Sequence, residues 1–198
     1  LSGNVAVLAA GSLSVATHTL TATYQGDTNF NASTASPVSQ TVNRANTTTR
    51  VTAAPNPSVF GQSVTFSATV AAVAPGAGTP TGIVTFTIDG APLAPVTLVN
   101  GLATYSTASL AVGAHTVSAT YGGDASFTTS SGALGGGQTV NQASSTTTVT
   151  SSANPSVFGQ SVTFTATVTF GAGTPTGVVT FTLDGSPVTR TLDGGVAT

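Results

Sequence analysis

One motif occurs twice in this chain, letter for letter: NPSVFGQSVTF spans residues 56–66 and again residues 154–164. A second pair of matching stretches lies on either side of the first copy, HTLTATY at residues 18–24 and HTVSATY at residues 115–121. Self-similarity at a fixed spacing is the sign of a repeat protein, and it has to be recognised before any single element is interpreted. One repeat unit of about 95–98 residues therefore covers the whole sequence.

The motif GTPTG fixes the phase of the repeat. It stands at residues 78–82 and returns at residues 173–177, after a three-residue deletion. Together with the first motif, this spacing predicts three segments: residues 1–45 as the C-terminal half of a repeat, residues 46–143 as a complete repeat, and residues 144–198 as the N-terminal half of another.

Apolar residues recur at every second position within a repeat. Val64, Phe66, Ala68 and Val70 alternate with serine and threonine, which is the pattern of a half-buried strand. Residues 84–88 and 115–121 alternate in the same way. We therefore predict that the intervening threonines are exposed and that these side chains are buried: Val64, Phe66, Val84, Phe86, Val117 and Tyr121.

The turns fall where such strands must end. Asp89-Gly90 and Asp184-Gly185 are dipeptides favoured in tight hairpins, because glycine accepts a positive φ without steric cost. Pro57 and Pro155 lack an N–H, so the strand there should be an edge strand or kink. No helical spacing extends over three turns. Seven short strands in about 97 residues are typical of an all-β, immunoglobulin-like Greek-key sandwich with essentially no helix.

The composition excludes several function classes. Only 4% of the residues are charged, and the polar share comes from 40 threonines and 22 serines. Arg44, Arg50 and Arg190 are the only cationic side chains besides histidine, too few to follow a nucleic-acid backbone. Without cysteine there is no disulfide and no thiolate metal site. No apolar run is long enough for a membrane span.

Two pairs of residues are candidates for chemistry. His18 and His115 open equivalent strands and could be metal ligands or general bases, but no carboxylate lies near them except Asp27 and Asp124, nine residues on. We favour a corner role in which each imidazole bonds to backbone. Asp27 and Asp124 could bind calcium, but one carboxylate per loop falls short of the six to eight oxygens that calcium takes. An Asx-type turn accounts for them.

The remaining candidates also have structural interpretations. Asp89, Asp184 and Asp193 fit turns, and Gly135–Gly137 precede a strand rather than the helix of a phosphate site. No G-x-S-x-G motif occurs. Asn31 and Asn46 match the N-glycosylation pattern, and the threonine-rich surface could carry O-linked sugars. Tyr24, Tyr105 and Tyr121 fit core and corner aromatics. We predict no catalytic, cofactor-binding or metal-binding residue, and no enzyme activity.

Taken in order, these motifs resemble a known family. NPSVFGQSVTF with the alternating strand after it, then G-T-P-T-G, then D-G, then H-T-x-x-A-T-Y-x-G-D, is similar to the bacterial immunoglobulin-like (Big-type) repeat. The resemblance covers the whole chain. It implies a Greek-key sandwich and an extracellular setting, secreted or on the cell surface, but it is not specific for function, because such modules occur as stalks, spacers and adhesin shafts.

Three functions remain open. The first is a structural building block of an extracellular bacterial fibre, stalk or filament, in which near-identical repeats follow one another on short linkers. The second is an adhesin or a module that binds glycan or protein through its end loops, although those loops carry few aromatic or charged residues. The third is an accessory domain of a secreted enzyme. The sequence favours the first.

The phase of the repeat also predicts an assembly. Leu1 corresponds to Leu98 and Thr198 to Thr104, so both ends are expected to fall inside a sandwich. Each half alone would expose half a core and an unpaired edge. We therefore expect head-to-tail completion by copies of the same chain, or by covalently continuing repeats that pack in the same way. Residues 192–198 and 1–7 copy the same strand, a surplus that this join does not explain.

Overall fold

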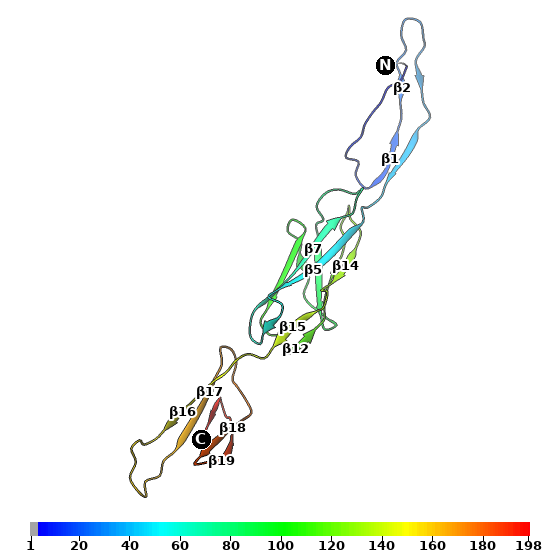
Figure 1. Cartoon of the computed structure of the whole chain (residues 1–198). Coiled ribbons are helices and arrows are strands. Elements are labelled where there is room, and N and C mark those ends of the chain that lie inside the picture. Colours follow the sequence, from blue (N-terminus) through cyan, green and yellow to red (C-terminus); the bar gives the residue numbers. More distant parts are fainter. Residues whose placement is uncertain (1–3) are drawn as a thin grey trace. The chain divides into compact units, whose positions relative to one another are not determined.

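A computed structural model of the chain describes residues 4–198, so Leu1 and its expected pairing lie outside the described residues. Throughout residues 4–198 the regular structure consists of β-strands joined by turns, and no helix is present (Figure 1). The predicted all-β fold class is confirmed. In this range there is accordingly no apolar helix of membrane-spanning length.

The segment 46–143 contains three small sheets. The largest has the strand order β10-β8-β13-β14, with β9 paired to β8; the others are β11-β7-β5 and β12-β15-β6. Their bounds are β5 (Thr47–Ala54), β6 (Ser58–Val59), β7 (Val64–Ala72), β8 (Ile83–Ile88), β9 (Ala91–Pro92), β10 (Val96–Thr97), β11 (Leu102–Thr107), β12 (Gly113–His115), β13 (Val117–Tyr121), β14 (Ser130–Ala133) and β15 (Gln138–Asn141).

The seven predicted strands are therefore divided into shorter pieces than the sequence suggested. Pro55 and Pro57 cannot donate a backbone hydrogen bond, and they separate β5 from β6. At Thr116 the chain passes from β12, which pairs with β15, to β13, which pairs with β8. The Thr116 N–H bonds there to the Asp89 carboxylate at 2.8 Å instead of to a strand. The chain thus changes sheets at one residue without leaving that donor unpaired.

The core has the composition that the alternation predicted. All six of the predicted side chains are buried, and Phe66, Val84, Phe86 and Tyr121 are completely inaccessible to solvent. The prediction for the intervening threonines is only partly correct. Thr69 and Thr120 are exposed, but Thr65, Thr85 and Thr87 are half-buried, because neighbouring side chains on the outer face of a pleated sheet cover one another.

The predicted turns are confirmed. Asp89 and Gly90 close the hairpin between β8 and β9 with φ angles of +50° and +81°. Asp184 and Gly185 repeat this geometry at +48° and +83°. Both central residues have positive φ, which is the geometry of the hairpin turn for which Asp-Gly is favoured.

The segments on either side are built from the same elements. Residues 4–45 contain two antiparallel pairs, β1 with β4 and β2 with β3. Residues 144–198 contain the sheet β16-β17-β20 and the hairpin of β18 and β19. The bounds are β1 (Ala16–Leu20), β2 (Thr23–Tyr24), β3 (Ser33–Thr34), β4 (Val38–Val42), β16 (Thr146–Ser151), β17 (Phe164–Thr169), β18 (Val178–Leu183), β19 (Ser186–Thr191) and β20 (Val196–Ala197).

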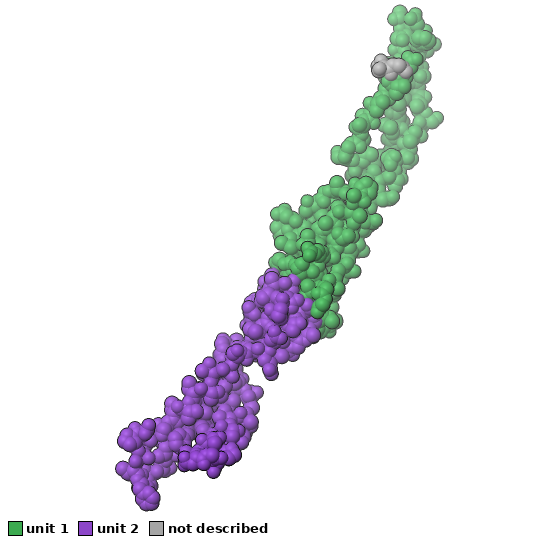
Figure 2. Space-filling view, in the orientation of Figure 1, with its two compact units in different colours: residues 1–52, 66–105, 116–136 green, residues 53–65, 106–115, 137–198 purple. Residues whose placement is uncertain are grey.

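The chain also separates into two compact units, coloured green and purple in Figure 2. Unit 1 contains residues up to Thr52 with residues 66–105 and 116–136; unit 2 contains residues 53–65, 106–115 and 137–198. The division therefore runs through the segment 46–143. The predicted segment boundaries at residues 45/46 and 143/144 stay a prediction from the sequence repeat.

Candidate functional site: the open faces of the flanking segments

In the segment 46–143, one strand ladder joins the first half of the repeat to the second. Strand β13 lies antiparallel to β8, with Val117 opposite Ile88, Ala119 opposite Phe86 and Tyr121 opposite Val84. These residues include the most deeply buried side chains of unit 1. The contact between β8 and β13 is therefore the centre of the junction between the two halves.

A carboxylate closes this junction at one end. The Oδ2 of Asp124 accepts hydrogen bonds from the Thr81 N–H at 2.8 Å and from the Thr81 hydroxyl at 2.7 Å. Its Oδ1 accepts the N–H groups of Ser126 and Phe127 at 2.8 and 2.9 Å, which is the predicted Asx-type turn. Partial burial raises the pKa of Asp124, but these hydrogen bonds outweigh it and lower the pKa to about 2.

Acid should therefore weaken the repeat through Asp124. Because the folded-state pKa is depressed from 3.8 to about 2, the contribution of this group is complete above about pH 4 and is lost as the pH falls towards 2. Urea unfolding of the intact chain at pH 6, 4, 3 and 2 measures the effect. We expect Asp124→Asn to be less stable at pH 6 and to lose less stability on acidification. An acid response identical to the unsubstituted chain would contradict this assignment.

A second polar cluster joins the halves in unit 2. The Nε2 of the buried Gln138 donates to the Ser58 hydroxyl and to the Pro55 carbonyl, both at 3.1 Å. Asn56 donates from Nδ2 to the Gly137 carbonyl at 2.8 Å and accepts the Thr139 N–H at Oδ1. Strand β6 runs parallel to β15 beside this cluster. Each contact pairs one residue from the first half of the repeat with one from the second.

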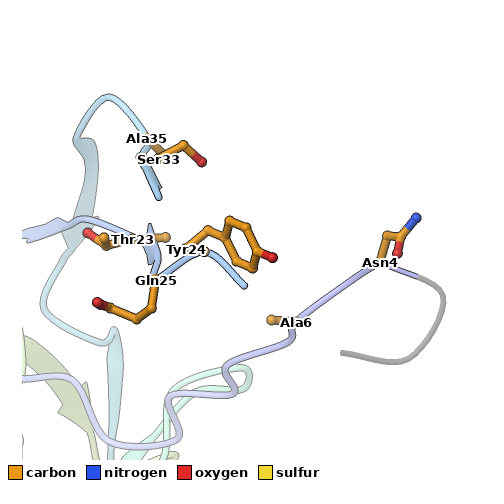
Figure 3. A pocket seen from close by; sticks show the side chains of 9 residues that line it. Asn4, Ala6, Thr23, Tyr24, Gln25, Ser33 and Ala35 are labelled. Atoms are coloured by element: carbon orange, nitrogen blue, oxygen red, sulfur yellow. The ribbon is translucent and has the colours of Figure 1, made fainter. Parts of the chain in front are cut away.

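The segment 4–45 has the second-half elements of a repeat without the first-half elements. Its core-type residues are exposed: Tyr24 is 36% and Phe30 67% accessible, whereas their counterparts Tyr121 and Phe127 are 0% and 5%. Asn4, Ala6, Tyr24, Ser33 and Ala35 contribute to a hollow of about 530 Å³. Figure 3 shows the Tyr24 ring projecting into it, with Asn4 and Ala6 on a separate stretch of chain. Residues whose counterparts are buried in the segment 46–143 are therefore exposed on this face.

Asp27 in this segment is bonded differently from Asp124. Its Oδ1 accepts the N–H groups of Asn29 and Phe30 at 2.8 and 2.9 Å, the same Asx-type turn. Its Oδ2, however, accepts the Tyr24 hydroxyl at 2.8 Å. The backbone bond from Asn29 and the hydroxyl of Tyr24 lower the pKa of Asp27, and the hydrogen bond to Asp27 raises the pKa of Tyr24.

The segment 144–198 has the first-half elements of a repeat without the second-half elements. Phe164 is 41% and Val149 58% accessible, whereas their counterparts Phe66 and Val51 are 0% and 6%. Hollows of about 360 and 280 Å³ lie over this face, and Phe164, Phe181 and Leu183 contribute to both. Strand β18 pairs with β19 alone, whereas its counterpart β8 pairs with β9, β10 and β13. One edge of β18 therefore carries unpaired backbone groups beside exposed apolar side chains.

The two histidines occupy equivalent positions, as the sequence suggested. The Nε2 of His18 lies 2.8 Å from the Ser14 carbonyl oxygen, and that of His115 lies 2.9 Å from the Ala111 carbonyl oxygen. A carbonyl oxygen only accepts, so Nε2 carries the proton in both residues and is not available to a metal. The structure does not place either residue at the start of a strand: His18 is the middle residue of β1 and His115 is the last residue of β12, and each imidazole bonds to the backbone four residues earlier. These contacts fit the corner role.

The other predicted residues lie apart from one another. Asp89 and Asp184 are in hairpin turns, and Asp193 is in the turn that precedes β20. Gly135–Gly137 lead into β15, and Tyr105 packs on Phe86 with the ring centroids 6.3 Å apart. Within residues 4–198, no three of the histidine and aspartate side chains come close enough to hold a metal ion.

We expect metal ions to leave the stability of the chain unchanged. The carboxylates of Asp27 and Asp124 already accept hydrogen bonds on both oxygens, so a cation would have to displace those donors. Thermal unfolding in millimolar CaCl₂ and in EDTA should give the same midpoint. A rise of several degrees in calcium would contradict the structural role of the two aspartates.

Sequence reasoning missed the polar residues that join the halves. Thr81, Asn56, Ser58 and Gln138 look like ordinary turn or surface residues, because nothing local distinguishes them from the other polar residues of the chain. The repeat could have pointed to these four residues, because each is kept unchanged in a second copy. Each has an identical counterpart in a flanking segment: Thr176, Asn154, Ser156 and Gln40.

Comparison with known proteins supports the fold. Residues 51–141 match the family described as bacterial Ig-like domain (group 3). No curated protein and no solved structure shows significant similarity to the chain. The resemblance inferred from the repeated motifs is confirmed over residues 51–141. Domains of this family commonly occur in surface or secreted proteins and are typically non-catalytic.

Proposed function

We propose that this chain, whose residues 51–141 are similar to bacterial Ig-like domains, is a structural building block of an extracellular fibre, stalk or filament. In this proposal the flanking segments are halves of further sandwiches, and each is completed head-to-tail by the complementary half of a neighbouring repeat. The same proposal gives the chain a mechanical role and no catalytic one.

The observation that carries the proposal is the contrast between identical residues in two settings. Phe66 and Phe164 end the same NPSVFGQSVTF motif, yet only Phe66 is covered. Phe127 and Phe30 differ in the same way. Burying a side chain of this size is worth about 1.5–3 kcal/mol, so each open face has a strong tendency to acquire a cover. The cover that fits is the half-repeat that covers the equivalent face in residues 46–143.

A second contact supports a chain of repeats. Phe60, just after β6, lies against Phe170 of the following segment, with ring centroids 6.1 Å apart. Phe158 is the counterpart of Phe60 in that segment and is completely exposed. A further repeat placed after residues 144–198 would shield Phe158 in part, as Phe170 shields Phe60, which is 40% accessible. Repeats joined in this way extend without a new interface for each one.

Self-association of the intact chain tests the proposal. Light scattering should give a mass near 19.1 kDa at high dilution and a rising mass, in multiples of it, as the concentration increases. Leu183→Asp places a charge on the open face and should abolish the increase. Val99→Asp, at an equally exposed apolar residue of the segment 46–143, is the matched control and should associate normally. A monomer at every concentration would disprove the proposal.

A further inference from the structure

We propose that the completed flanking repeat is closed by an exchange of partners at Asp27: Thr176 of a second copy of this chain takes the carboxylate oxygen that Tyr24 holds in the open segment. This inference rests on the proposed function, since it specifies the contacts and the register of the head-to-tail join. It adds a local rearrangement that distinguishes the open state from the closed one.

The two aspartates supply the evidence for the exchange. Oδ1 has the same two kinds of donor in both loops, the backbone N–H groups two and three residues further on. Only the donor to Oδ2 differs: it is Thr81 where the repeat is complete and Tyr24 where the repeat is open. In the complete repeat the hydroxyl of Tyr121 is buried and is not at hydrogen-bonding distance from another described residue, although it stays close enough to Asp124 that burial and the neighbouring carboxylate raise the pKa of Tyr121 to about 12. The short hydrogen bond to Oδ2 therefore comes from the threonine in the complete repeat and from the tyrosine in the open one, while the tyrosine of the complete repeat stays beside the carboxylate.

Thr176 is the residue that fits this place. It is the second threonine of GTPTG at residues 173–177, as Thr81 is at residues 78–82. Thr176 is exposed, and its side chain makes no hydrogen bond within the part of the chain that the structure describes. The aspartate that would accept from it belongs to the second half of a repeat, which residues 144–198 do not contain. Asp27 holds the corresponding position in residues 4–45 and is the acceptor that we assign to it.

The strand register is consistent with this contact. Placing β1 and β2 on the open edge of β18, in the register of β13 on β8, sets Leu20 opposite Leu183 and Tyr24 opposite Val179. In the complete repeat, Thr81 lies three residues before Val84, and Asp124 lies three residues after Tyr121. Thr176 and Asp27 have the same offsets from Val179 and Tyr24. The register that pairs the apolar residues thus also brings the threonine to the carboxylate.

Comparing the open segment with the complete repeat also identifies one position where the proposed join must differ from the contact within residues 46–143. Ala35 stands where the complete repeat has Gly132. A Cβ at Gly132 would overlap the carbonyl oxygen of Thr49, whose counterpart is Thr147. The join must therefore be wider between β3 and β16 than between β14 and β5. Ala35→Gly should remove this obstacle and strengthen association, whereas Ser36→Gly, next to it, should not.

Disulfide trapping tests the contact directly, because the chain has no cysteine of its own. We expect the intact chain with Asp27→Cys and Thr176→Cys to form a ladder of disulfide-linked multimers under mild oxidation. The pair Thr81→Cys and Asp124→Cys, at the equivalent contact of the complete repeat, should instead form a disulfide within one chain. The pair Asp27→Cys and Thr148→Cys is the off-register control and should give no ladder. Arg50, the counterpart of Thr148 in the complete repeat, is exposed, so the side chain at position 148 is expected to face away from the join.

The strength of the contact is measured on the chain without cysteine. Thr176→Ala should weaken self-association about 10- to 100-fold, as expected for losing hydrogen bonds to a charged acceptor, whereas Thr148→Ala should leave it unchanged. A ladder together with this loss supports the exchange. Association without a ladder, or a 27–176 disulfide within one chain, overturns it and leaves the structural function standing. Absence of association overturns both.

Discussion

Phe66→Ala should lower the free energy of unfolding of the segment 46–143 by about 3–5 kcal/mol, because it removes a ring that is completely buried on β7 and leaves a cavity. Thr65→Ala, one position along the strand and half-buried, should cost less than about 1 kcal/mol. Urea unfolding followed by tyrosine fluorescence measures both values. A Tyr24→Phe background restricts the signal to Tyr105 and Tyr121 of this segment.

The repeat provides a control with the same local sequence. Phe164→Ala alters the identical motif in the segment 144–198, where the ring is 41% accessible. In the dilute chain this substitution should leave the unfolding of residues 46–143 unchanged and should weaken self-association instead. An equal loss of stability from Phe66→Ala and Thr65→Ala would mean that the strand register is wrong, since a shift by one residue exchanges the two faces.

Gly132→Ala should destabilise the same segment by about 3 kcal/mol, which is the upper part of the range for overpacked sites. The added Cβ would overlap the carbonyl oxygen of Thr49 and lie 2.9 Å from its carbonyl carbon, and both are backbone atoms that cannot rotate away. The substitution forces β14 away from β5 and breaks the hydrogen bond of 2.7 Å between the hydroxyls of Thr49 and Ser130.

Gly135→Ala is the matched control, because a Cβ there meets no atom within 4 Å. Unfolding of the two variants in urea, together with hydrogen exchange at the amides of Ala119 and Tyr121, should show the loss for Gly132→Ala alone. A Gly132→Ala variant as stable as Gly135→Ala would contradict the close approach of the two strands.

Much of this fold follows from alternation and turn chemistry. Val64, Phe66, Val84 and Phe86 are buried because every second residue of a strand faces the same side, and the Asp-Gly turns follow from the positive φ that they need. These are local rules that a single segment obeys by itself. They were sufficient for the fold class and for the core.

The contacts that join the two halves of the repeat could not be predicted from such local rules. Thr81 and Asp124 are 43 residues apart, and Ser58 and Gln138 are 80 apart, so no local pattern pairs them. The half-buried state of Thr65 and Thr85 likewise depends on neighbouring strands. The strand breaks at Pro55–Pro57 and at Thr116 depend on which sheet each short strand joins. These tertiary contacts override the continuous alternation of the sequence.

Under the structural role proposed above, the parallel pairing of β6 with β15 would decide how the repeat responds to a pulling force. Ser58 lies beside Val140 and Val59 beside Asn141, and the Phe60 N–H bonds to the Asn141 carbonyl at 2.9 Å. The chain enters the repeat before β6 and leaves it after β15, so a pulling force drags these parallel strands in opposite directions along their axes. Their hydrogen bonds are then loaded in shear and have to break together, whereas antiparallel terminal strands would peel apart one bond at a time.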